Sequence, residues 1–402
     1  MTKQFSKKKK KCLACGNNPT SHRVSWISSW FSTEVNPLAQ RIFQTYLGRE
    51  LFYFAEWILN HLYETLAFVG IMKFNPNPVS ARSDRGRVLF DEAIARGWKM
   101  ETGMVYGQAM DMYRVIFPNG KKIYFNGLPR PDIHESLAVG WMDDKALLKK
   151  CLQKEGIPVP KGGGFSNIEE AKKCYYDLDC PVIVKPRLGS RGRHTTTNLT
   201  KVEDFEKAFW SAKQMGSYVI VEEHLIGSVY RATMIDGVLV GVLAGDPPQI
   251  TGDGIKTIHE LIAIKNKNRD SRISEVIFSE KLDFFLERQG NTLNEILPVD
   301  RIIDLSEKIG LSYGGKSREV TGDVHPKLRA ELERAARAVN DPVLGFDFIT
   351  TDVSLDPETV RWGIIECNAV PFTDLHHYPL EGAPVNVAGK LWDYVAQKHG
   401  IV

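Results

Sequence analysis

Three oxygen-bearing side chains near the C-terminus have the types and spacing of a cation site. Glu366 and Asn368 lie two residues apart in a segment, 363–368, that predicts a short strand, and Asp347 lies in an earlier strand-like segment. Alternate side chains of a strand point to one face, so Asp347 can join the other two from a neighbouring strand. Such oxygens suit Mg²⁺, which keeps waters and shares its shell with substrate phosphates. Two core strands with polar ends would explain these residues equally well, and segments upstream decide between the two interpretations.

A lysine followed by a glycine loop supplies the second group. The strand predicted at 182–184 leads to Lys185 and then to residues 189–193, which contain Gly189, Ser190, Arg191, Gly192 and Arg193. The lysine is a point charge at a strand end, and the glycines allow backbone N–H groups to approach oxygen atoms closely. Neither GxxxxGK[ST] nor GxGxxG is present. The alternative is an ordinary hairpin with exposed arginines.

A third group follows the strand predicted at 218–222. Glu222 and Glu223 stand where the strand could offer backbone groups to the edge of an adenine, and Leu225 could cover its face. This signal is weak alone. In order with Lys145, Lys185, the 189–193 loop and the 347/366/368 set, it favours a nucleotide site with Mg²⁺.

Both helices and strands are needed to position these residues, and the sequence predicts an α+β fold with more than one layer. We expect helices at 88–97, 143–156 and 202–215, and strands at 115–117 and 122–125 joined by an Asn119-Gly120 turn. A further strand is expected at 194–198. The predicted domains are a basic tail (1–24), a helical then α/β N-terminal domain (25–140), a subdomain with the lysine and glycine loop (141–215), and a subdomain with the metal site (216–402).

The composition indicates which partners and which cellular setting to expect for the protein. The chain has 402 residues and a net charge of +3, largely from the run 7–11, so its body is close to neutral and we expect no nucleic-acid partner. The apolar pattern in 37–72 has helical spacing and is interrupted by charged residues. We therefore expect it in the domain core or at a dimer contact, and not across or on a membrane. No secretory signal is evident, and scattered cysteines fit a reducing cytoplasmic setting.

Cys12 and Cys15 have a spacing that is typical of zinc ligands, but no second pair follows. His22 is the one nearby third ligand, so the sequence favours an unmetallated tail, disordered or forming a small element, over a zinc site.

Residues 141–390 resemble an ATP-grasp carboxylate–amine ligase, and most closely the ATP-grasp part of cyanophycin synthetases. D-alanine–D-alanine ligase and glutathione synthetase are more distant resemblances. The matching segments, in order, are Asp144-Lys145, 156–160, Val184-Lys185-Pro186, 189–193, 222–227, Tyr230-Arg231, 251–258, 260–262, Gly314-Gly315-Lys316-Ser317, 323–326 and 376–387. The run Thr251-Gly252-Asp253-Gly254-Ile255-Lys256-Thr257-Ile258 is particularly typical of the cyanophycin-like branch.

The resemblance implies an ATP-grasp fold and an ADP-forming enzyme that makes an amide or peptide bond through an acylphosphate. Lys145 and Lys185 would hold ATP phosphates, under the 189–193 loop, with Glu222, Glu223 and Leu225 bordering the adenine. It further implies that Asp347, Glu366 and Asn368 bind two Mg²⁺ ions, which Mn²⁺ could replace. Arg231 would face the reacting carboxyl group, and the 314–317 loop, with Gly315 and Ser317, would offer donors there.

Two departures from the family pattern stand out. Val229 occupies the position where relatives carry a carboxylate for the ribose, so we expect ribose binding to be weaker or to be supplied by Ser228 or Glu223. The Mur-ligase-like domain of cyanophycin synthetases is not seen before Val402, so we do not expect a two-reaction polymer synthetase.

The substrates are not identified by the sequence. Amino acids or short peptides are expected, and several arginines suggest a substrate with more than one carboxylate. His376, His377 and Asp374 lie in the acceptor region, where we expect hydrogen-bonded supporting residues rather than acid–base catalysts. A different acceptor, such as a thiol, is a further option. The alternative function is a nucleotide-binding regulatory or scaffold protein that has lost ligase activity. A homo-oligomer is also expected.

Overall fold

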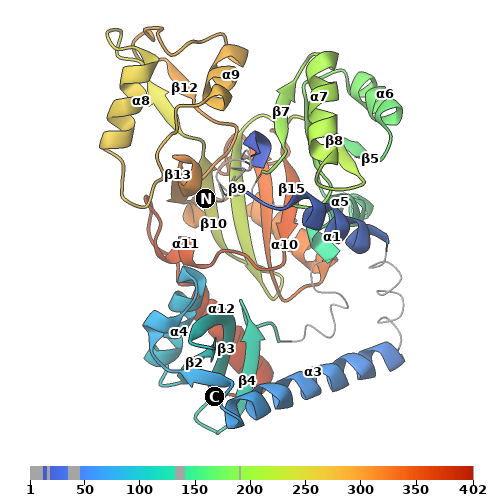
Figure 1. The fold of residues 1–402 in the computed structure, drawn as a ribbon, viewed down its shortest axis with the longest axis vertical. Helices are drawn as coiled ribbons and strands as arrows, with labels where there is room; N and C mark the ends of the chain where they lie inside the picture. Colours follow the sequence, from blue (N-terminus) through green and yellow to red (C-terminus); the bar gives the residue numbers. More distant parts are fainter. Residues whose placement is uncertain (1–11, 16–18, 35–45, 132–140, 190–191, 402) are drawn as a thin grey trace, which may run out of the picture. The chain divides into compact units, whose positions relative to one another are not determined.

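The chain forms two compact units, and each unit is built from three separate segments of the sequence. A computed structural model describes residues 12–15, 19–34, 46–131, 141–189 and 192–401 (Figure 1). Unit 1 comprises residues 1–35, 160–224 and 247–308, and unit 2 comprises residues 36–159, 225–246 and 309–402. The domain boundaries predicted at residues 140 and 215 assumed contiguous stretches, and these units cross them.

The larger sheet of unit 2 is antiparallel, with the strand order β13-β10-β9-β14-β15. One face is apolar and packs on helices α5 and α10, where Ala232, Phe346 and Phe348 are fully buried. Strand alternation therefore sends the neighbouring residues of the same strands to the opposite face. The elements are α5 (Lys145–Lys154), β9 (Ser228–Ile235), β10 (Val238–Asp246), β13 (Lys316–Glu319), α10 (Pro326–Val339), β14 (Val343–Thr350), β15 (Gly363–Asn368) and α11 (Asp374–His377).

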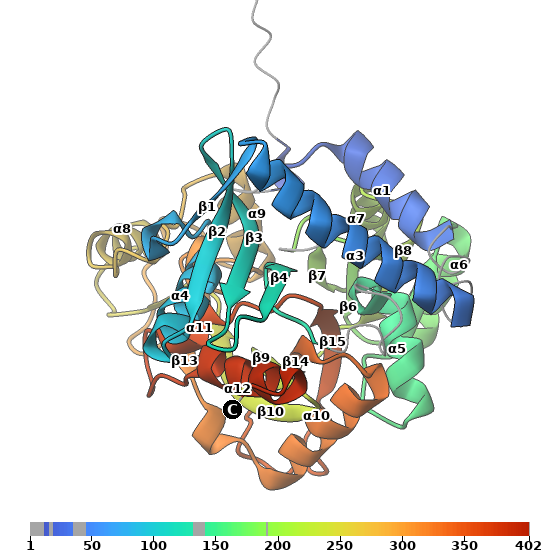
Figure 2. The same ribbon diagram turned by 90° about the horizontal axis from the view of Figure 1, so that it is seen from below.

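A second antiparallel sheet of unit 2 has the order β1-β2-β3-β4 and shares a core with the C-terminal helix α12. Trp392 of α12 is fully buried, and its Nε1 donates to the carbonyl of Leu89 at 3.0 Å. Figure 2 shows α12 also lying along β9 and β10, which it contacts. The elements are β1 (Met72–Asn75), α4 (Asp84–Ala95), β2 (Lys99–Val105), β3 (Gln108–Ile116), β4 (Lys122–Asn126) and α12 (Val387–His399).

The hairpin predicted in this region is confirmed. Ile116 pairs with Lys122, and Gly120 has φ of 83°, as the tight turn between the strands requires. The helix expected at 88–97 is α4, the one at 143–156 is α5, and the one at 202–215 is α7 (Val202–Lys213).

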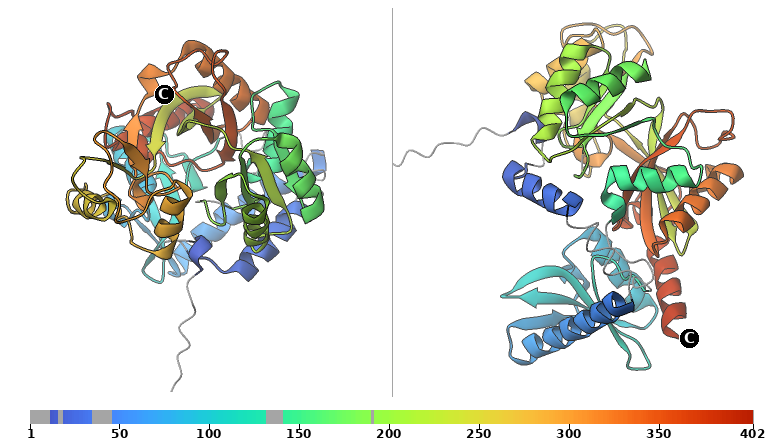
Figure 3. Two further views of the ribbon diagram at one scale, coloured as in Figure 1. Left: turned by 90° about the horizontal axis from the view of Figure 1, so that it is seen from above. Right: turned by 90° about the vertical axis from the view of Figure 1, so that its right-hand side faces the viewer.

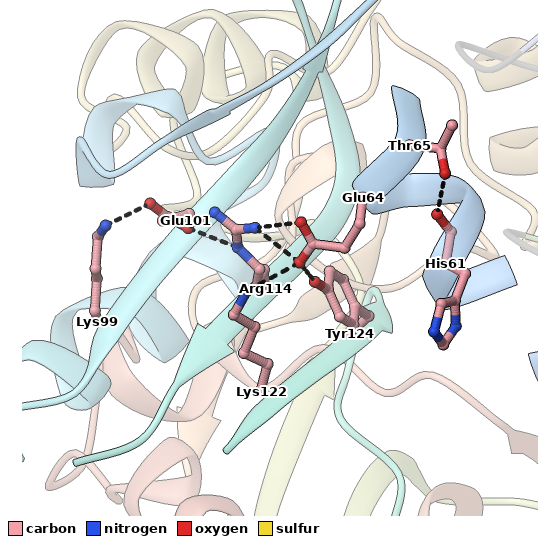
Figure 4. Close-up of polar contacts among 8 residues, drawn as sticks. All are labelled: His61, Glu64, Thr65, Lys99, Glu101, Arg114, Lys122 and Tyr124. Carbon is pink, nitrogen blue, oxygen red and sulfur yellow. Dashed lines mark hydrogen bonds and ion pairs between the residues drawn. The ribbon is translucent and has the colours of Figure 1, made fainter. Parts of the chain in front are cut away.

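Helix α3 (Tyr46–Phe68) is tied to the small sheet by charge (Figure 4). Glu64 accepts from Arg114 at 3.2 Å, from Lys122 at 3.1 Å and from the hydroxyl of Tyr124. The Tyr124 hydrogen bond is the main reason that the pKa of Glu64 is lowered. Burial and the Glu64 carboxylate raise the pKa of Tyr124 to about 12. This pairing fixes the C-terminal half of α3.

The apolar pattern predicted for this helix does not enter a core of the chain. Most of its large apolar side chains that the structure describes are exposed, with Trp57 56% and Leu51 52% accessible. Burial in the domain core was therefore wrong for these residues, and the dimer contact remains a prediction. Within the described part of the chain, no helix combines the length and apolar character needed to cross a membrane.

Unit 1 is built on an antiparallel sheet of order β5-β8-β6-β7 covered by helices α6 and α7, which lie side by side (Figure 3). Val182, Val184, Val219 and Val221 point to this covered face and form its core. A smaller cluster joins β11 and β12 to α8 and α9. The elements are α1 (His22–Glu34), β5 (Gly162–Phe165), α6 (Ile168–Leu178), β6 (Val182–Pro186), β7 (Thr196–Leu199), α7, β8 (Val219–Glu223), β11 (Gln249–Thr251), α8 (Ile258–Lys267), α9 (Glu280–Arg288) and β12 (Ile302–Asp304).

Candidate active site

The polar face of the large sheet in unit 2 carries a row of charged side chains. Asp347 on β14 lies directly opposite Arg231 on β9 and Glu366 on β15. Side chains at directly opposite positions on adjacent antiparallel strands share a face and touch. Asn368 is two residues beyond Glu366, so it shares this face, as predicted. Its amide Nδ2 lies 3.5 Å from Asp347 Oδ2.

Arg231 and Asp347 form a forked ion pair. Nε and Nη2 of Arg231 each donate to one oxygen of Asp347, both at 2.7 Å. Burial by itself would lower the pKa of Arg231, but the Asp347 carboxylate outweighs it and the pKa is raised. The sequence predicted Arg231 in the substrate region without this partner. The pair leaves lone pairs on both oxygens of Asp347, because each carboxylate oxygen can accept more than one contact.

Lys145 reaches the other end of the row. It is the first residue of α5, whose N-terminus is capped by Asp144 accepting from Ala146 and Leu147. Its ammonium lies 2.9 Å from Oε1 of Glu366, and the lysine side chain is 6% exposed. An ammonium has three donors, and Glu366 lies against the Lys145 ammonium.

Gly315 and Ser317 lie at the opposite edge of the same sheet, on or beside β13. A Cβ at Gly315 would stand 2.1 Å from the carbonyl oxygen of Asp246, so a larger residue does not fit without moving the backbone. Ser317 pairs with Gly245. By alternation it belongs to the polar face, and its buried hydroxyl has no hydrogen-bond partner among the described residues.

A buried histidine on this face, which was expected as a hydrogen-bonded supporting residue, makes two polar contacts. His376 of α11 is fully buried, with Nε2 2.8 Å from the hydroxyl of Thr233 and Nδ1 2.7 Å from Oε2 of Glu319. A Cβ at Gly241 would lie 2.6 Å from the imidazole ring. Sequence reasoning missed Glu319 and Thr233, although both stand two residues from a predicted site residue on the same strand.

In unit 1, the sheet face away from the helices carries Lys185. Its ammonium lies 3.0 Å from Oε2 of Glu222, and these side chains are only 7% and 2% exposed. Gly189 and Gly192 have φ of 129° and 56°, values that favour glycine. Ser190 and Arg191 lie outside the described residues, and Arg193 is half-buried at the end of the loop.

The two remaining predicted adenine contacts have different surroundings. Glu223 accepts from the backbone N–H of Lys161 at 2.8 Å. Leu225 belongs to unit 2, where it is buried beside Gly363. The structure therefore distributes the predicted set over both units.

The oxygen set of unit 2 fits a hard divalent cation. Two carboxylates and one amide stand on adjacent positions of one sheet face, and oxygen ligands of this kind are those that Mg²⁺ prefers. The unpartnered hydroxyl of Ser317 lies on the same face but at the opposite edge of the sheet, away from this oxygen set.

This arrangement is an α+β ATP-grasp fold, as comparison with solved structures indicates. The crystal structure of a bifunctional glutathione synthetase from Pasteurella multocida matches 79% of this chain and 43% of its own, with a TM-score of 0.52 and 24% identity. At that identity the likeness concerns the fold alone. The chain matches no family model.

Among curated proteins, the chain is similar to cyanophycin synthetases. That of Trichormus variabilis is 32% identical over 257 residues, which are 62% of this chain and 28% of the relative. The bifunctional glutathione biosynthesis protein of Clostridium perfringens is 29% identical over 261 residues, or 63% of this chain and 34% of the relative. The chain thus spans about a third of the length of these relatives.

One relative extends the similarity towards the N-terminus. The bifunctional glutathione biosynthesis protein of Mannheimia succiniciproducens is 29% identical over 323 residues, 76% of this chain and 42% of the relative. This is a larger share than residues 141–402 can supply, so part of the region before residue 141 is matched too. Sequence reasoning had found no usable resemblance there.

Proposed function

We propose that the protein is an ADP-forming ligase that joins a carboxylate to an amine. The observation that carries this proposal is the row Arg231, Asp347 and Glu366 on one sheet face, with Lys145 of α5 against Glu366, which sets carboxylates for Mg²⁺ between two cations. The names of the similar proteins, cyanophycin synthetase and glutathione biosynthesis protein, support amino acids or short peptides as substrates.

The chemistry requires charge neutralisation above all. A substrate carboxylate oxygen attacks the γ-phosphorus of ATP and ADP leaves, so two negative groups must approach each other. An amine then attacks the acylphosphate carbon, and phosphate leaves with the original carboxylate oxygen. Bound Mg²⁺, held by Asp347, Glu366 and Asn368, supplies Lewis-acid neutralisation of the phosphates. Two ions, with Mn²⁺ as a substitute, are part of this proposal.

The protein's own residues position the reactants. Lys145 and Lys185 hold phosphate oxygens, and the 189–193 loop covers them from water. Arg231 orients the reacting carboxyl group while held by Asp347. Gly315 brings a backbone donor close to that group, and Ser317 adds a hydroxyl. Glu222, Glu223 and Leu225 border the adenine.

The test is ADP release with Mg-ATP and a panel of amino acids and short peptides. We expect release that depends on both an acid and an amine. Labelling the acid's carboxyl group with heavy oxygen should transfer one labelled atom to phosphate. No ADP release across the panel, with ATP binding intact, would refute the ligase and favour a nucleotide-binding regulatory protein.

A variant at Lys185 sharpens this test. Removing the lysine alone leaves Glu222 buried without its cation, which costs about 3–5 kcal/mol. The double variant Lys185→Met with Glu222→Gln removes both charges and should fold. We expect its kcat/KM to fall by roughly 100-fold or more. Lys207→Ala, an exposed lysine of the same unit, should keep full activity.

A further inference from the structure

Four side chains of unit 1 converge without belonging to the ATP site. The ligand atoms of Cys12, Cys15, His22 and His194 all lie within 4.8 Å of one another. Cys15 and His194 are buried, and the other two are half-buried. They come from the short helix at Leu13–Cys15 and the residue before it, from the first residue of α1, and from the residue that follows the 189–193 loop.

Four distances between ligand atoms of the cluster are close to those of a tetrahedral zinc site. With Zn–S near 2.3 Å and Zn–N near 2.05 Å, tetrahedral ligands stand about 3.6 Å apart for S···N and about 3.3 Å for N···N. In this cluster Cys12 Sγ and Cys15 Sγ lie 3.6 and 3.5 Å from His194 Nε2, and Cys15 Sγ lies 3.3 Å from His22 Nε2. The two imidazole Nε2 atoms are 3.2 Å apart.

Hydrogen bonding fixes which nitrogen of His194 faces the cluster with a lone pair. Its Nδ1 lies 2.7 Å from the carbonyl oxygen of Ser211, which can only accept, so Nδ1 carries the proton. Nε2 of the neutral ring is then an acceptor that points at two sulfurs and another nitrogen. A metal-ligating histidine usually has this outer contact to a carbonyl. One cation explains the convergence of four electron-pair donors.

We propose that Cys12, Cys15, His22 and His194 bind one structural Zn²⁺ ion that fastens the N-terminal segment to the end of the glycine loop. Two thiolates and two imidazoles are the soft, tetrahedral set that selects zinc, and four protein ligands leave no open position for catalysis. The sequence alone does not favour zinc, because His194 lies 179 residues from Cys15 and has no local feature of a ligand.

The contacts around the cluster also join the N-terminal segment to the rest of unit 1. The N–H of His194 donates to the carbonyl of Ala14 at 3.1 Å, so the backbone also joins these segments. Further along, α1 packs closely on the segment that follows α7, because a Cβ at Gly216 would stand 2.3 Å from Oγ of Ser29. His194 has φ of 53°, an uncommon value for a residue other than glycine, and ligation would hold it there.

Zinc binding has a consequence that rests on the proposed function. His194 directly follows the 189–193 loop, so the ion would fix the point at which the phosphate loop returns to β7. Loss of that anchor should raise the KM for ATP by roughly tenfold, because misplaced binding groups weaken positioning. The turnover number should change less.

The experiment measures metal content of the full chain, produced without a histidine tag and purified without chelators. We expect about one zinc ion per chain by mass spectrometry. Exchange with Co²⁺ should give the visible absorption bands of tetrahedral cobalt with thiolate ligands. Cys15→Ser and His194→Ala should lose the ion, and Cys180→Ser, an exposed thiol of the same unit, should keep it.

His194→Cys keeps the proposal testable if the other variants fail to fold, since it replaces one zinc ligand with another. It should retain zinc and restore the KM for ATP. Absence of zinc and of cobalt–thiolate bands, full zinc content in Cys15→Ser, or a Cys12–Cys15 disulfide in place of the metal would each overturn the proposal. The measurement of metal content does not depend on ATP turnover. If the protein binds zinc but releases no ADP, the proposed ligase function is refuted and the zinc site is not.

Discussion

The oxygen row of unit 2 and the sulfur–nitrogen cluster of unit 1 are two ways of building a cation site. In the row, the carboxylates of Asp347 and Glu366 are held by Arg231 and Lys145. These two side-chain cations therefore keep the carboxylates in place. In the cluster, the ligand atoms of two thiols and two imidazoles lie within 4.8 Å of one another, and the proposed zinc ion would hold them together. The row suits an ion that arrives with its substrate, and the cluster suits a permanent one.

The two sites also differ in how the chain assembles them. The row stands on adjacent strands of one sheet, where register alone sets Arg231, Asp347 and Glu366 side by side. The cluster joins an N-terminal helix to a loop end. A substitution in the row should therefore mainly lower ATP turnover. A substitution in the cluster should mainly weaken the attachment of the N-terminal segment to the rest of unit 1.

The largest effect that separates the sites is expected for Glu366→Gln. Glutamine has the same size and can still accept from Lys145, but it removes the charge that neutralises Mg²⁺. We expect kcat/KM for ATP turnover to fall by about 100-fold to 1,000-fold. Zinc content and melting temperature should stay close to those of the parent protein.

The matched control is Glu358→Gln, an exposed carboxylate of unit 2 that pairs with Lys327. It should keep full activity, because surface ion pairs contribute little. If Glu366→Gln kept its ATP turnover, Glu366 would have only a structural role and the contrast between the two sites would fail.

Much of the oxygen row could be predicted because its signals are local. Strand alternation in 363–368 places Glu366 and Asn368 on one face, and the structure pairs this strand with β14. The antiparallel register that sets Arg231 against Asp347 depends on topology between residues 116 positions apart. Alternation reports the face of a side chain but not its neighbour across the sheet.

The cluster could not be predicted for the same reason. Cys12 and Cys15 were visible as a pair, but the ligand that completes the set lies beyond α1, β5, α6 and β6 of unit 1 in the chain. His194 is a lone histidine in a loop, with no local feature that marks it as a ligand. Only the fold brings it to the thiols.

A smaller effect is expected from the support beneath the row. His376→Phe leaves Glu319, whose side chain is 3% exposed, without its imidazole partner, and it removes the partner of the Thr233 hydroxyl. An uncompensated buried group of this kind costs about 2–4 kcal/mol. Chemical denaturation followed by fluorescence should show this loss with zinc content unchanged.

The control for that change is His259→Phe, an exposed histidine of unit 1 that stacks on Phe278. Its stability should remain nearly that of the parent. Equal stability of both variants would mean that the Glu319–His376–Thr233 contacts do not support the row.

The smallest effect concerns Asp374, which contributes negative charge near Arg231. Burial raises the pKa of its carboxyl above the usual 3.8, and Asp84 raises it further, while Arg85 and His376 oppose the shift. Its buried Oδ1 has no hydrogen-bond partner within the described ranges. Because the folded state binds the proton more tightly than the unfolded state, ionised Asp374 destabilises the fold at neutral pH. That cost disappears as the pH falls through the raised pKa to below 3.8.

Asp374→Asn should therefore stabilise the protein at neutral pH by about 1 kcal/mol or less, and the gain should vanish in acid. Thermal unfolding across this pH range measures it. Asp356→Asn should have the opposite sign at neutral pH, because hydrogen bonding from Lys327 lowers the pKa of Asp356. A gain in stability joined to a loss of ATP turnover would indicate that Asp374 is kept for function. The same gain in stability with full ATP turnover would mean that turnover does not need the Asp374 carboxylate, and that only the charges of the row are kept for function.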